Sequence, residues 1–333
     1  MARGRRWSIV LAGGDGVRTS AFIRRWLGSA KPKQYCAFVG TRSMFQHTLD
    51  RAACLTPWER VVVVAARHHQ PEVWHQLDGR PAGIVLLQPE NRDTAAGLFL
   101  PLTYILARDP GASVVVYPSD HFIYPEDRFV RAVEQAARGS ELLGGRPVLL
   151  AARPDSFELE YGWIRPGRFL GWTGDAPVLA VDSFVEKPDE SAARRAKDTG
   201  GLWNTMVLAA GGKQLWDLGR DCFPEVVGLF DRLTRAIDTA DEPKVLAAIY
   251  ETMPRKNFSS HLLQRRPDRL AVMEMRGSCG ATGGTLRGSR RHSTRSANNR
   301  PSRRRRVNYF TRDEPSTSGG AIRTSRTLTA QAR

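Results

Sequence analysis

The chain has 333 residues, of which 50 are Lys or Arg and 34 are Asp or Glu, so its formal net charge is +16. This charge is unevenly spread, because residues 277–333 hold 13 Arg, no Lys and only two acids, which leaves a net charge of +5 for residues 1–276. The basic character therefore belongs mainly to the last 57 residues. The preceding part is long enough to form one large domain with a substantial core.

The sequence excludes several classes of protein. The four cysteines, at positions 36, 54, 222 and 279, are scattered and have neither C-x-x-C nor zinc-ligand spacing, which indicates a reducing compartment and no disulfide framework. No apolar run reaches the length of a membrane span. The opening "MARGRRWSIVLAGG" is basic, but its apolar run is short and leads into glycines, so we interpret it as a first strand and not a signal peptide. We expect a soluble, cytoplasmic protein without a membrane partner.

Strand-like and helix-like segments alternate along residues 1–276. Short β-branched or aliphatic runs predict buried strands at Trp7–Ala12, Arg60–Ala66, Ile84–Gln88, Val114–Tyr117, Pro147–Ala152, Leu179–Val185 and Leu270–Met275. Apolar residues at helical spacing predict helices at Thr94–Arg108, Glu126–Leu142, Phe223–Ile237 and Pro243–Met253. This alternation predicts an α/β fold, a Rossmann-like three-layer sandwich with a mixed, mainly parallel sheet. The predicted domain is 1–276, followed by a disordered basic tail, 277–333.

The segments that follow the predicted strands are the candidate site, because ligands of open α/β sheets bind beyond the carboxyl ends of the strands. In "IVLAGGDGVRTSAF", Gly13, Gly14 and Gly16 let the main chain approach a ligand and direct N–H groups at phosphates. Arg18 adds a fixed cation where such phosphates would lie. The segment matches neither G-x-G-x-x-G nor a Walker A loop, so an ordinary strand-to-helix turn is the alternative.

Two further segments offer a cation and amide groups. In "KPKQY", Lys33 follows Pro32 and has the character of a positioned ammonium, although a solvated loop lysine is the commoner case. In "QPENRDTAAG", Gln88 and Asn91 could bind a base edge through their amides. Thr94 could equally be only the N-cap of the following helix.

The segment "VVVYPSDHFI" contains a candidate metal ligand. Asp120 follows a buried strand and Pro118, which brings its carboxylate to the ligand-binding edge of the sheet. A hard oxygen ligand there suits Mg²⁺ carried in by a nucleoside triphosphate. We expect His121 to be a structural hydrogen-bonding residue, because no second His supplies a zinc-like partner for it.

Taken in this order, the segments resemble the sugar-1-phosphate nucleotidyltransferase family and, within it, the mannose-1-phosphate guanylyltransferases, or GDP-mannose pyrophosphorylases. The resemblance covers residues 7 to about 275. The matching stretches are LAGGDGVR (11–18), PKQY (32–35), QPENRDTA (88–95), PSDH (118–121), YGWI (161–164), FVEKP (184–188) and WNT (203–205).

The resemblance implies a reaction and a set of roles. An oxygen of mannose-1-phosphate attacks the α-phosphorus of GTP in line, GDP-mannose forms and pyrophosphate leaves, with positioning and charge neutralisation as the main sources of catalysis. Arg18 and Lys33 would neutralise the triphosphate, and Asp120 would hold Mg²⁺ as the cofactor. Nucleotide-binding roles fall to Leu11, Ala12, Gly13, Gly14, Gly16, Gln88, Asn91 and Thr94, and sugar-phosphate-binding roles to Gly162, Glu186, Lys187 and Asn204.

Two of these implied roles have a simple alternative. The resemblance implies that Glu186 accepts hydrogen bonds from sugar hydroxyls and that Lys187 pairs with the phosphate. Without the resemblance, the two residues would be interpreted as a solvated charge pair after a strand. A homodimer is compatible with the resemblance but has no separate support in the sequence.

The chain departs from the family pattern in ways that leave alternatives open. Thr19 stands where many relatives have Leu, and Ala96 where many have Pro. A UTP- or dTTP-using enzyme of the same family is therefore one alternative. Relatives also carry a Trp-Ser-Asp-Trp-Gly or Trp-Ser-Asp-Val-Gly segment after the strand that corresponds to "RLAVMEM", and its Asp resembles a second metal ligand. Its absence makes a nucleotide-binding relative without turnover a second alternative.

A change of reading frame would explain the missing segment. The stretch "SCGATGGTLRGS" can be encoded so that a shifted frame translates as Leu-Trp-Ser-Asp-Trp-Gly-Asp-Ala-Pro-Arg-Ile. We hypothesise that the frame changes near Arg276–Ser278 and that the domain is truncated at its C-terminal end. Resequencing of the gene and its transcript across this point tests the hypothesis, and an intact frame would contradict a sequencing error.

The tail has one further interpretation. "RRRR" at 303–306 and the dispersed arginines could bind nucleic acid through phosphate contacts, although Tyr309 and Phe310 are the tail's only aromatic residues. We regard a nucleic-acid partner as the lesser alternative. The composition of the tail predicts disorder, because little apolar surface is available to offset chain entropy.

Overall fold

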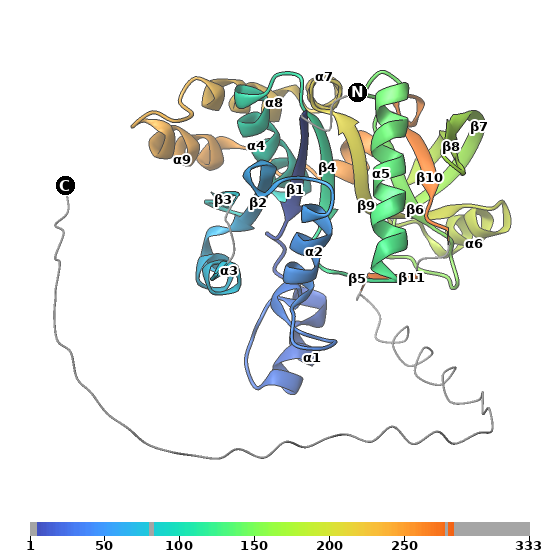
Figure 1. Cartoon of the computed structure of the whole chain (residues 1–333), viewed down its shortest axis with the longest axis horizontal. Coiled ribbons are helices and arrows are strands. Elements are labelled where there is room, and N and C mark those ends of the chain that lie inside the picture. The colour runs from blue at the N-terminus through green and yellow to red at the C-terminus, as the bar shows by residue number, and fades with distance from the viewer. Residues whose placement is uncertain (1–4, 80–82, 277–278, 283–333) are drawn as a thin grey trace, which may run out of the picture. The chain divides into compact units, whose positions relative to one another are not determined.

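The computed structural model describes residues 5–79, 83–276 and 279–282. All of them belong to one compact unit, Met1–Gly288, and the second unit, Ser289–Arg333, lies outside the described residues. Figure 1 labels the elements of the first unit. Its strands are β1 (Arg6–Leu11), β2 (Val61–Ala66), β3 (Ile84–Gln88), β4 (Ser113–Pro118), β5 (His121–Tyr124), β6 (Val148–Ala152), β7 (Trp163–Thr173), β8 (Ala176–Val185), β9 (Leu202–Gly211), β10 (Ala271–Glu274) and β11 (Cys279–Thr282).

Helices connect most of the strands. The α-helices are α1 (Val17–Leu27), α2 (Met44–Ala53), α3 (Gln70–Leu77), α4 (Asp93–Arg108), α5 (Glu126–Leu142), α6 (Glu190–Asp198), α7 (Gly212–Cys222), α8 (Pro224–Thr234) and α9 (Glu242–Thr252). Short 3₁₀ turns form at Lys33–Tyr35, Trp58–Arg60, Arg67–His69 and Pro267–Arg269, and Ser259–Leu263 is a π-helical turn.

The main sheet has nine strands in the order β3-β2-β1-β4-β9-β6-β10-β8-β7. The strands β3, β2, β1 and β4 are parallel, and β6 is parallel to β10. β9 runs antiparallel to both β4 and β6, and β8 runs antiparallel to β10 and β7. The sheet is therefore mixed and mainly parallel, as predicted.

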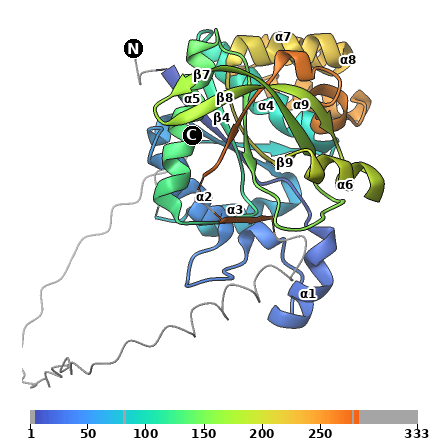
Figure 2. The same ribbon diagram turned by 90° about the vertical axis from the view of Figure 1, so that its right-hand side faces the viewer.

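Helices cover both faces of this sheet because successive residues of its strands point into two different apolar cores. Ile9 of β1 packs into one core with α4, α7, α8 and α9, whereas the next residue, Val10, packs into the other core with α2, α3 and α5. Val62 and Val63 of β2 divide in the same way. Figure 2 shows α5 and α9 on opposite sides of the sheet, which confirms the predicted three-layer architecture.

The predicted elements are confirmed with small changes of boundary. The predicted segments Ile84–Gln88 and Glu126–Leu142 coincide with β3 and α5, and the predicted helix Phe223–Ile237 is shorter, as α8. The sequence patterns did not identify β5, β7 or β9, nor α1, α2, α3, α6 or α7. β9 carries the stretch "WNT" of the family resemblance, but its place between β4 and β6 depends on pairing with residues about 50 to 100 positions away.

The predicted disordered tail requires one correction. Its residues Cys279–Thr282 form β11, which pairs antiparallel with β5 in a separate two-stranded sheet, with Cys279 opposite Tyr124 and Thr282 opposite His121. The physical reason is that β5 offers an edge of unpaired main-chain groups, which can bind another extended segment whatever its side chains are. The rest of the tail, including the segment 303–306, lies outside the described residues, so its predicted disorder and nucleic-acid binding remain predictions.

Two findings bear on the excluded classes. None of the helices in the described part of the chain combines the length and apolar character that a membrane crossing requires. Cys36, Cys54 and Cys222 are free thiols.

Candidate functional site

A glycine loop connects β1 to α1 at the carboxyl edge of the sheet. The Ala12 amide donates to the carbonyl of Val64 on β2 over 2.8 Å, so the loop starts from a fixed main chain. Gly16 is the N-cap of α1, with φ of 61°, a left-handed conformation that favours glycine. A Cβ at Gly16 would lie 3.3 Å from the Lys33 amide nitrogen. The first turn of α1 has no acidic residue and no side-chain cap, so its free amides suit an anion.

The 3₁₀ turn Lys33–Tyr35 clamps this loop. The Gln34 side-chain amide donates to the carbonyl oxygens of Ala12, over 3.1 Å, and Gly14, over 2.7 Å. The Tyr35 hydroxyl also donates to the Ala12 carbonyl, over 3.0 Å. Sequence analysis assigned no role to Gln34 or Tyr35, although both lie in the "PKQY" stretch. Their burial shows that this stretch supports the loop as well as supplying a lysine.

Lys33 and Asp120 meet in the cleft next to the loop. The Lys33 ammonium lies 2.7 Å from an Asp120 carboxylate oxygen, and Lys33 is only 8% exposed. The alternative of a solvated loop lysine is therefore wrong. Burial acts to raise the pKa of Asp120, but His121 and Lys33 together hold that pKa below its usual range. Asp120 is thus a carboxylate at neutral pH, as a metal or ammonium ligand must be.

These groups share one cleft with Arg18. A cleft of about 340 Å³ is lined by Gly16, Val17, Arg18, Thr19, Lys33, Asp120 and Tyr161. The structure therefore brings together the loop glycine and both cations predicted to bind a triphosphate, with the predicted metal ligand on the same wall. Thr19, one of the departures from the family pattern, donates its hydroxyl to the Gly16 carbonyl over 3.0 Å.

The groups around Asp120 suit a Mg²⁺ ion that takes a single carboxylate from the protein. The Oδ2 atom of Asp120 is paired with Lys33, and Oδ1 lies 3.6 Å from the His121 ring. Within the described residues, Asp120 does not belong to a group of three or more metal-binding side chains. A single carboxylate suffices when substrate phosphates and waters supply the other oxygens. Asp120 therefore fits as a protein ligand that leaves the other positions of the ion to substrate oxygens and waters.

The residues predicted to bind the sugar phosphate lie together beyond this cleft. A Cβ on Gly162 would meet a Glu186 carboxylate oxygen at 2.8 Å, so the absence of a side chain there lets Glu186 approach. The main-chain amide of Asn204 donates to the Gly162 carbonyl over 2.8 Å. Lys187 has a φ of 48°, a conformation that is rare for a residue with a side chain and is concentrated at functional sites.

Glu186 is half-buried, and burial is the main cause that raises its pKa. Lys187 and Ser259 act in the opposite direction but do not offset the burial. Glu186 and Lys187 are not a fully solvated pair, because Glu186 is half-buried and the exposed Lys187 ammonium lies 3.8 Å from a Glu160 carboxylate oxygen. A partly buried carboxylate with a raised pKa is more often found at a functional site than on an ordinary surface.

Glu160 connects the two parts of the site, and sequence analysis missed it. Its Oε2 atom lies 2.5 Å from the Arg18 guanidinium and 3.8 Å from the Lys187 ammonium. The three side chains are each about half exposed. The Glu160 carboxylate is thus a counter-ion both to Arg18, which is predicted to bind the triphosphate, and to Lys187, which is predicted to bind the sugar phosphate. Only the fold reveals this, because the three residues are far apart in the sequence.

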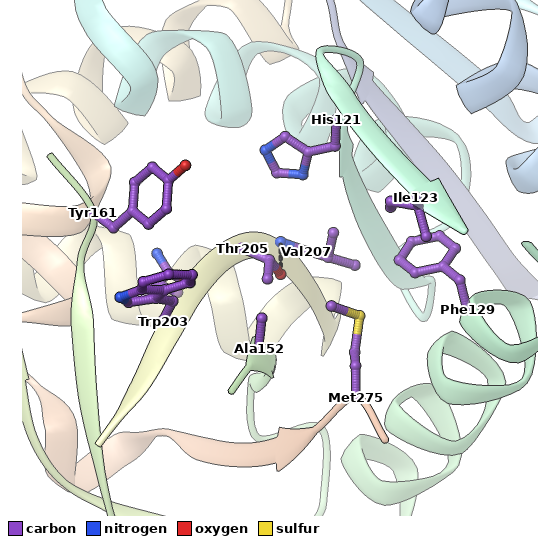
Figure 3. A pocket seen from close by; sticks show the side chains of 10 residues that line it. His121, Ile123, Phe129, Ala152, Tyr161, Trp203, Thr205, Val207 and Met275 are labelled. Atoms are coloured by element: carbon purple, nitrogen blue, oxygen red, sulfur yellow. Dashed lines mark hydrogen bonds between the residues drawn. The ribbon is translucent and has the colours of Figure 1, made fainter. Parts of the chain in front are cut away.

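Tyr161 stands between the large cleft and a small cavity of about 20 Å³. Figure 3 shows Tyr161 and His121 facing one another across this cavity, with Trp203 and Met275 on its walls. Burial lowers the pKa of His121 to about 4, so its ring is neutral at pH 7. The cavity is large enough for one water molecule but not for a sugar.

The predicted base-binding residues do not line the 340 Å³ cleft. The Gln88 amide nitrogen donates to the Tyr250 hydroxyl over 3.0 Å, and its Oε1 would lie 3.0 Å from a Cβ on Gly13. Gln88 thus supports the glycine loop from behind. The Asn91 side-chain oxygen accepts a hydrogen bond from the Asp93 amide over 2.9 Å.

The remaining nucleotide-binding predictions involve Thr94, Leu11 and Ala12. Thr94 is not the N-cap of α4, because that position belongs to Arg92, and its hydroxyl accepts instead from the Phe258 amide over 2.8 Å. The Leu11 carbonyl accepts from Ser119, so Leu11 ties the Asp120 loop to the glycine loop. Contact of these residues with a nucleotide remains a prediction.

Comparison with known proteins identifies relatives. Residues 7–222 match the family model described as nucleotidyl transferase. The alginate biosynthesis protein AlgA of Pseudomonas aeruginosa is 27% identical over 265 residues, which cover 77% of this chain and 52% of AlgA. The mannose-1-phosphate guanylyltransferase RfbM of Salmonella typhimurium is 33% identical over 205 residues, which cover 60% of this chain and 40% of RfbM. The chain thus spans about half, or less, of the length of these curated relatives.

A solved structure has the same fold. The crystal structure of a mannose-1-phosphate geranyltransferase from Thermus thermophilus is similar to this chain, with a TM-score of 0.73 and 25% identity. The match covers 86% of this chain and 78% of that protein. RfbM and the protein of this solved structure both have mannose-1-phosphate in their names.

Proposed function

The chain belongs to the nucleotidyl transferase family, and from this premise we propose that it transfers a guanylyl group from GTP to mannose-1-phosphate. An oxygen of the sugar phosphate attacks the α-phosphorus of GTP, and a new phosphorus–oxygen bond forms. The bond between the α-phosphorus and the bridging oxygen breaks, and pyrophosphate leaves with the electron pair. The products are GDP-mannose and pyrophosphate, so atoms and charges balance without a further reactant.

The observation that carries the proposal is the shared cleft of Gly16, Arg18, Lys33 and Asp120. Two cations and the free amides at the start of α1 face one volume of about 340 Å³, which matches the size of ordinary ligand sites. Such an arrangement suits a highly charged anion such as a triphosphate. Fixed donors and cations that face developing charge are the main catalytic device of phosphoryl and nucleotidyl transfer.

The charged side chains of the cleft then have defined tasks. Lys33 is held by burial and by Asp120, so its ammonium is positioned before substrate arrives and can pass from the carboxylate to a phosphate oxygen. Arg18 is half exposed and free to follow the phosphates, provided that it leaves Glu160. Asp120 would hold Mg²⁺, which when bound supplies additional neutralisation of the phosphates. The Gln34 and Tyr35 hydrogen bonds keep the glycine loop in shape throughout.

The sugar phosphate would bind on the side of Gly162, Glu186, Lys187 and Asn204. Glu186 supplies a carboxylate that can accept hydrogen bonds from sugar hydroxyls, and Lys187 supplies a cation for the phosphate. Their proximity through Gly162 supports this assignment. The choice of guanine and mannose rests on the name of the relative RfbM, which is a mannose-1-phosphate guanylyltransferase.

A pyrophosphate-release assay with a panel of substrates tests the proposal. GTP, ATP, UTP and dTTP are each combined with mannose-1-phosphate and glucose-1-phosphate, with Mg²⁺ present, and the product is identified by mass spectrometry. We expect GTP with mannose-1-phosphate to be at least about 10-fold faster than any other pair, a difference that one missing hydrogen-bond set can produce. A preference for UTP or dTTP would move the protein to another branch of the family.

A second candidate function is nucleotide binding without turnover. It is favoured by one observation: within the described residues, Asp120 belongs to no group of three or more metal-binding side chains. Equilibrium binding of GTP, measured alongside the assay, separates the two. Binding without pyrophosphate release from any pair would support this candidate and contradict the transferase proposal.

A further inference from the structure

A group of metal-binding side chains lies outside the cleft, at the neighbouring position of the sheet edge. Asp15 belongs to the glycine loop after β1, and His68 and His69 belong to the 3₁₀ turn Arg67–His69 after β2. β1 and β2 are adjacent and parallel, with Leu11 opposite Val64, so the two loops leave the sheet side by side. The fold thus brings the Asp15 carboxylate next to two adjacent histidines that lie more than 50 residues further along the sequence.

The geometry of the group matches the size of a coordination sphere. The His68 Nε2 atom lies 2.8 Å from Asp15 Oδ1, and the His69 Nε2 atom lies 3.4 Å from the same oxygen. One ligand atom from each residue lies within 4.8 Å of the other two. Tetrahedral ligands about 2.1 Å from a zinc ion are separated by roughly 3.4 Å. Small rotations of the exposed side chains would therefore place all three donors around one ion.

The group combines a fixed donor with two adaptable ones. The His69 ring is only 4% exposed and packs edge-on against the Tyr35 ring at 5.5 Å, so its position is set by the core. His68 is 65% exposed and Asp15 38% exposed, so solvent and ions can reach them.

We propose that Asp15, His68 and His69 form a binding site for a divalent transition-metal ion, with Zn²⁺ as the best match. Imidazole nitrogens favour zinc and its neighbours, whereas Mg²⁺ prefers an all-oxygen set such as Asp120 with phosphates. Three protein donors leave one position of a tetrahedral ion open for water or a ligand. The site is therefore chemically distinct from the one that Asp120 would provide.

The site has a structural consequence for the glycine loop. Asp15 stands between Gly14 and Gly16, and Gln34 already holds the Gly14 carbonyl. An ion on Asp15 would fix the other side of the same loop to the end of β2. Since the loop conformation decides where its amides point, the metal and any anion bound by the loop would affect each other's affinity reciprocally. The metal site itself does not depend on the proposed transferase function.

Calorimetric titration of Zn²⁺ into the metal-free full-length protein tests the proposal, without nucleotide or Mg²⁺. We expect one tight site, and we expect His68→Ala and Asp15→Asn each to weaken it by at least about 10-fold, as loss of a ligand or its partner does. Neither side chain is buried, so both variants are expected to fold, which circular dichroism checks.

A matched control uses another exposed histidine–carboxylate pair of the described chain. His47 lies 3.2 Å from Glu126 but has no second imidazole beside it, so His47→Ala is expected to leave the tight site intact. Asp120→Asn is also expected to retain it. Zinc affinity that is equal in the wild type and the His68→Ala variant would overturn the proposal, as would loss of the site in Asp120→Asn. A negative pyrophosphate-release assay would contradict the transferase function alone.

Discussion

The two sides of the candidate site, that of the glycine loop and that of Glu186, are built by different physical means. On the side of the glycine loop, Lys33 is buried, and the main chain is held by hydrogen bonds from Gln34 and Tyr35. On the side of Glu186, the cations Arg18 and Lys187 are half exposed and share the carboxylate of Glu160. The first side is organised before any ligand binds, whereas the charges of the second side must exchange partners. Preorganisation should therefore make substitutions on the loop side the more damaging ones.

The largest effect is expected for Lys33→Ala. Removal of a buried, positioned cation should lower the rate of pyrophosphate release by about 100-fold or more, because such fixed charges are worth that much in a site shielded from water. Lys31→Ala is the matched control, since Lys31 pairs with Glu72 at 2.9 Å on the neighbouring surface and does not line the cleft. A folded Lys33→Ala enzyme with full activity would contradict the view that the preorganised charge on the loop side drives catalysis.

A smaller loss is expected for Gly16→Ala. An alanine with φ near 61° should cost about 1 kcal/mol of folding free energy, and its Cβ would press on the Lys33 amide at 3.3 Å. We expect about 10-fold weaker nucleotide binding, measured by calorimetry. Gly40→Ala separates strain from function, since Gly40 has φ of 67° with open space around it. Equal nucleotide affinities in the two variants would show that the close approach of Gly16 to Lys33 has no functional importance.

A gain is expected for Glu160→Gln on the second side of the site. Loss of this counter-ion releases Arg18 and Lys187, so nucleotide affinity at low ionic strength should rise about 2- to 5-fold, the range that exposed ion pairs allow. Salt should reduce the gain, because exposed charges are screened. Glu190→Gln, which removes only the helix pair with Arg194, serves as the control. Weaker nucleotide binding in Glu160→Gln would mean that Glu160 organises the site and does not merely occupy its cations.

The smallest effect is expected for Glu186→Gln, measured as stability. Burial raises the pKa of Glu186, so the native state binds its proton more tightly than the unfolded state does. This contribution to stability is present below the ordinary carboxyl pKa and is lost as pH rises through the raised value. At pH 7 the glutamine variant should therefore melt higher, by about 2 °C, the shift that about 1 kcal/mol gives in a domain of this size.

The same measurement at acid pH provides the internal control for Glu186. Below about pH 4 the carboxyl is largely protonated in both states, and the difference from glutamine should disappear. A glutamine variant that is less stable at pH 7 would contradict the view that this carboxylate is retained at a cost in stability. It would then be a structural ion-pair partner of Lys187, and the second side would be better organised than the distances indicate.

Local patterns in the sequence were sufficient for much of the fold and part of the site. Residues 84–88 and 126–142 carry clear strand and helix patterns, and the structure has β3 and α5 with these bounds. The glycines after β1 and the aspartate after β4 reach the ligand edge because parallel strands place their carboxyl ends there. Successive apolar residues of β1 and β2 point to opposite faces of the sheet, so the two strands require an apolar core on each face and hence three layers. These conclusions need only the spacing of neighbouring residues.

Long-range pairing decided the rest. The antiparallel entry of β9 between β4 and β6, the clamp of Gln34 on the glycine loop, the Glu160 bridge and the group of Asp15, His68 and His69 all join distant segments. No local pattern specifies such contacts, because the partner of a strand or a charge depends on sheet order and register. The sequence by itself thus determined which chemical groups stand at the edge of the sheet. Only the tertiary structure decided which of them meet, since contacts between distant residues form only when the whole sheet is assembled.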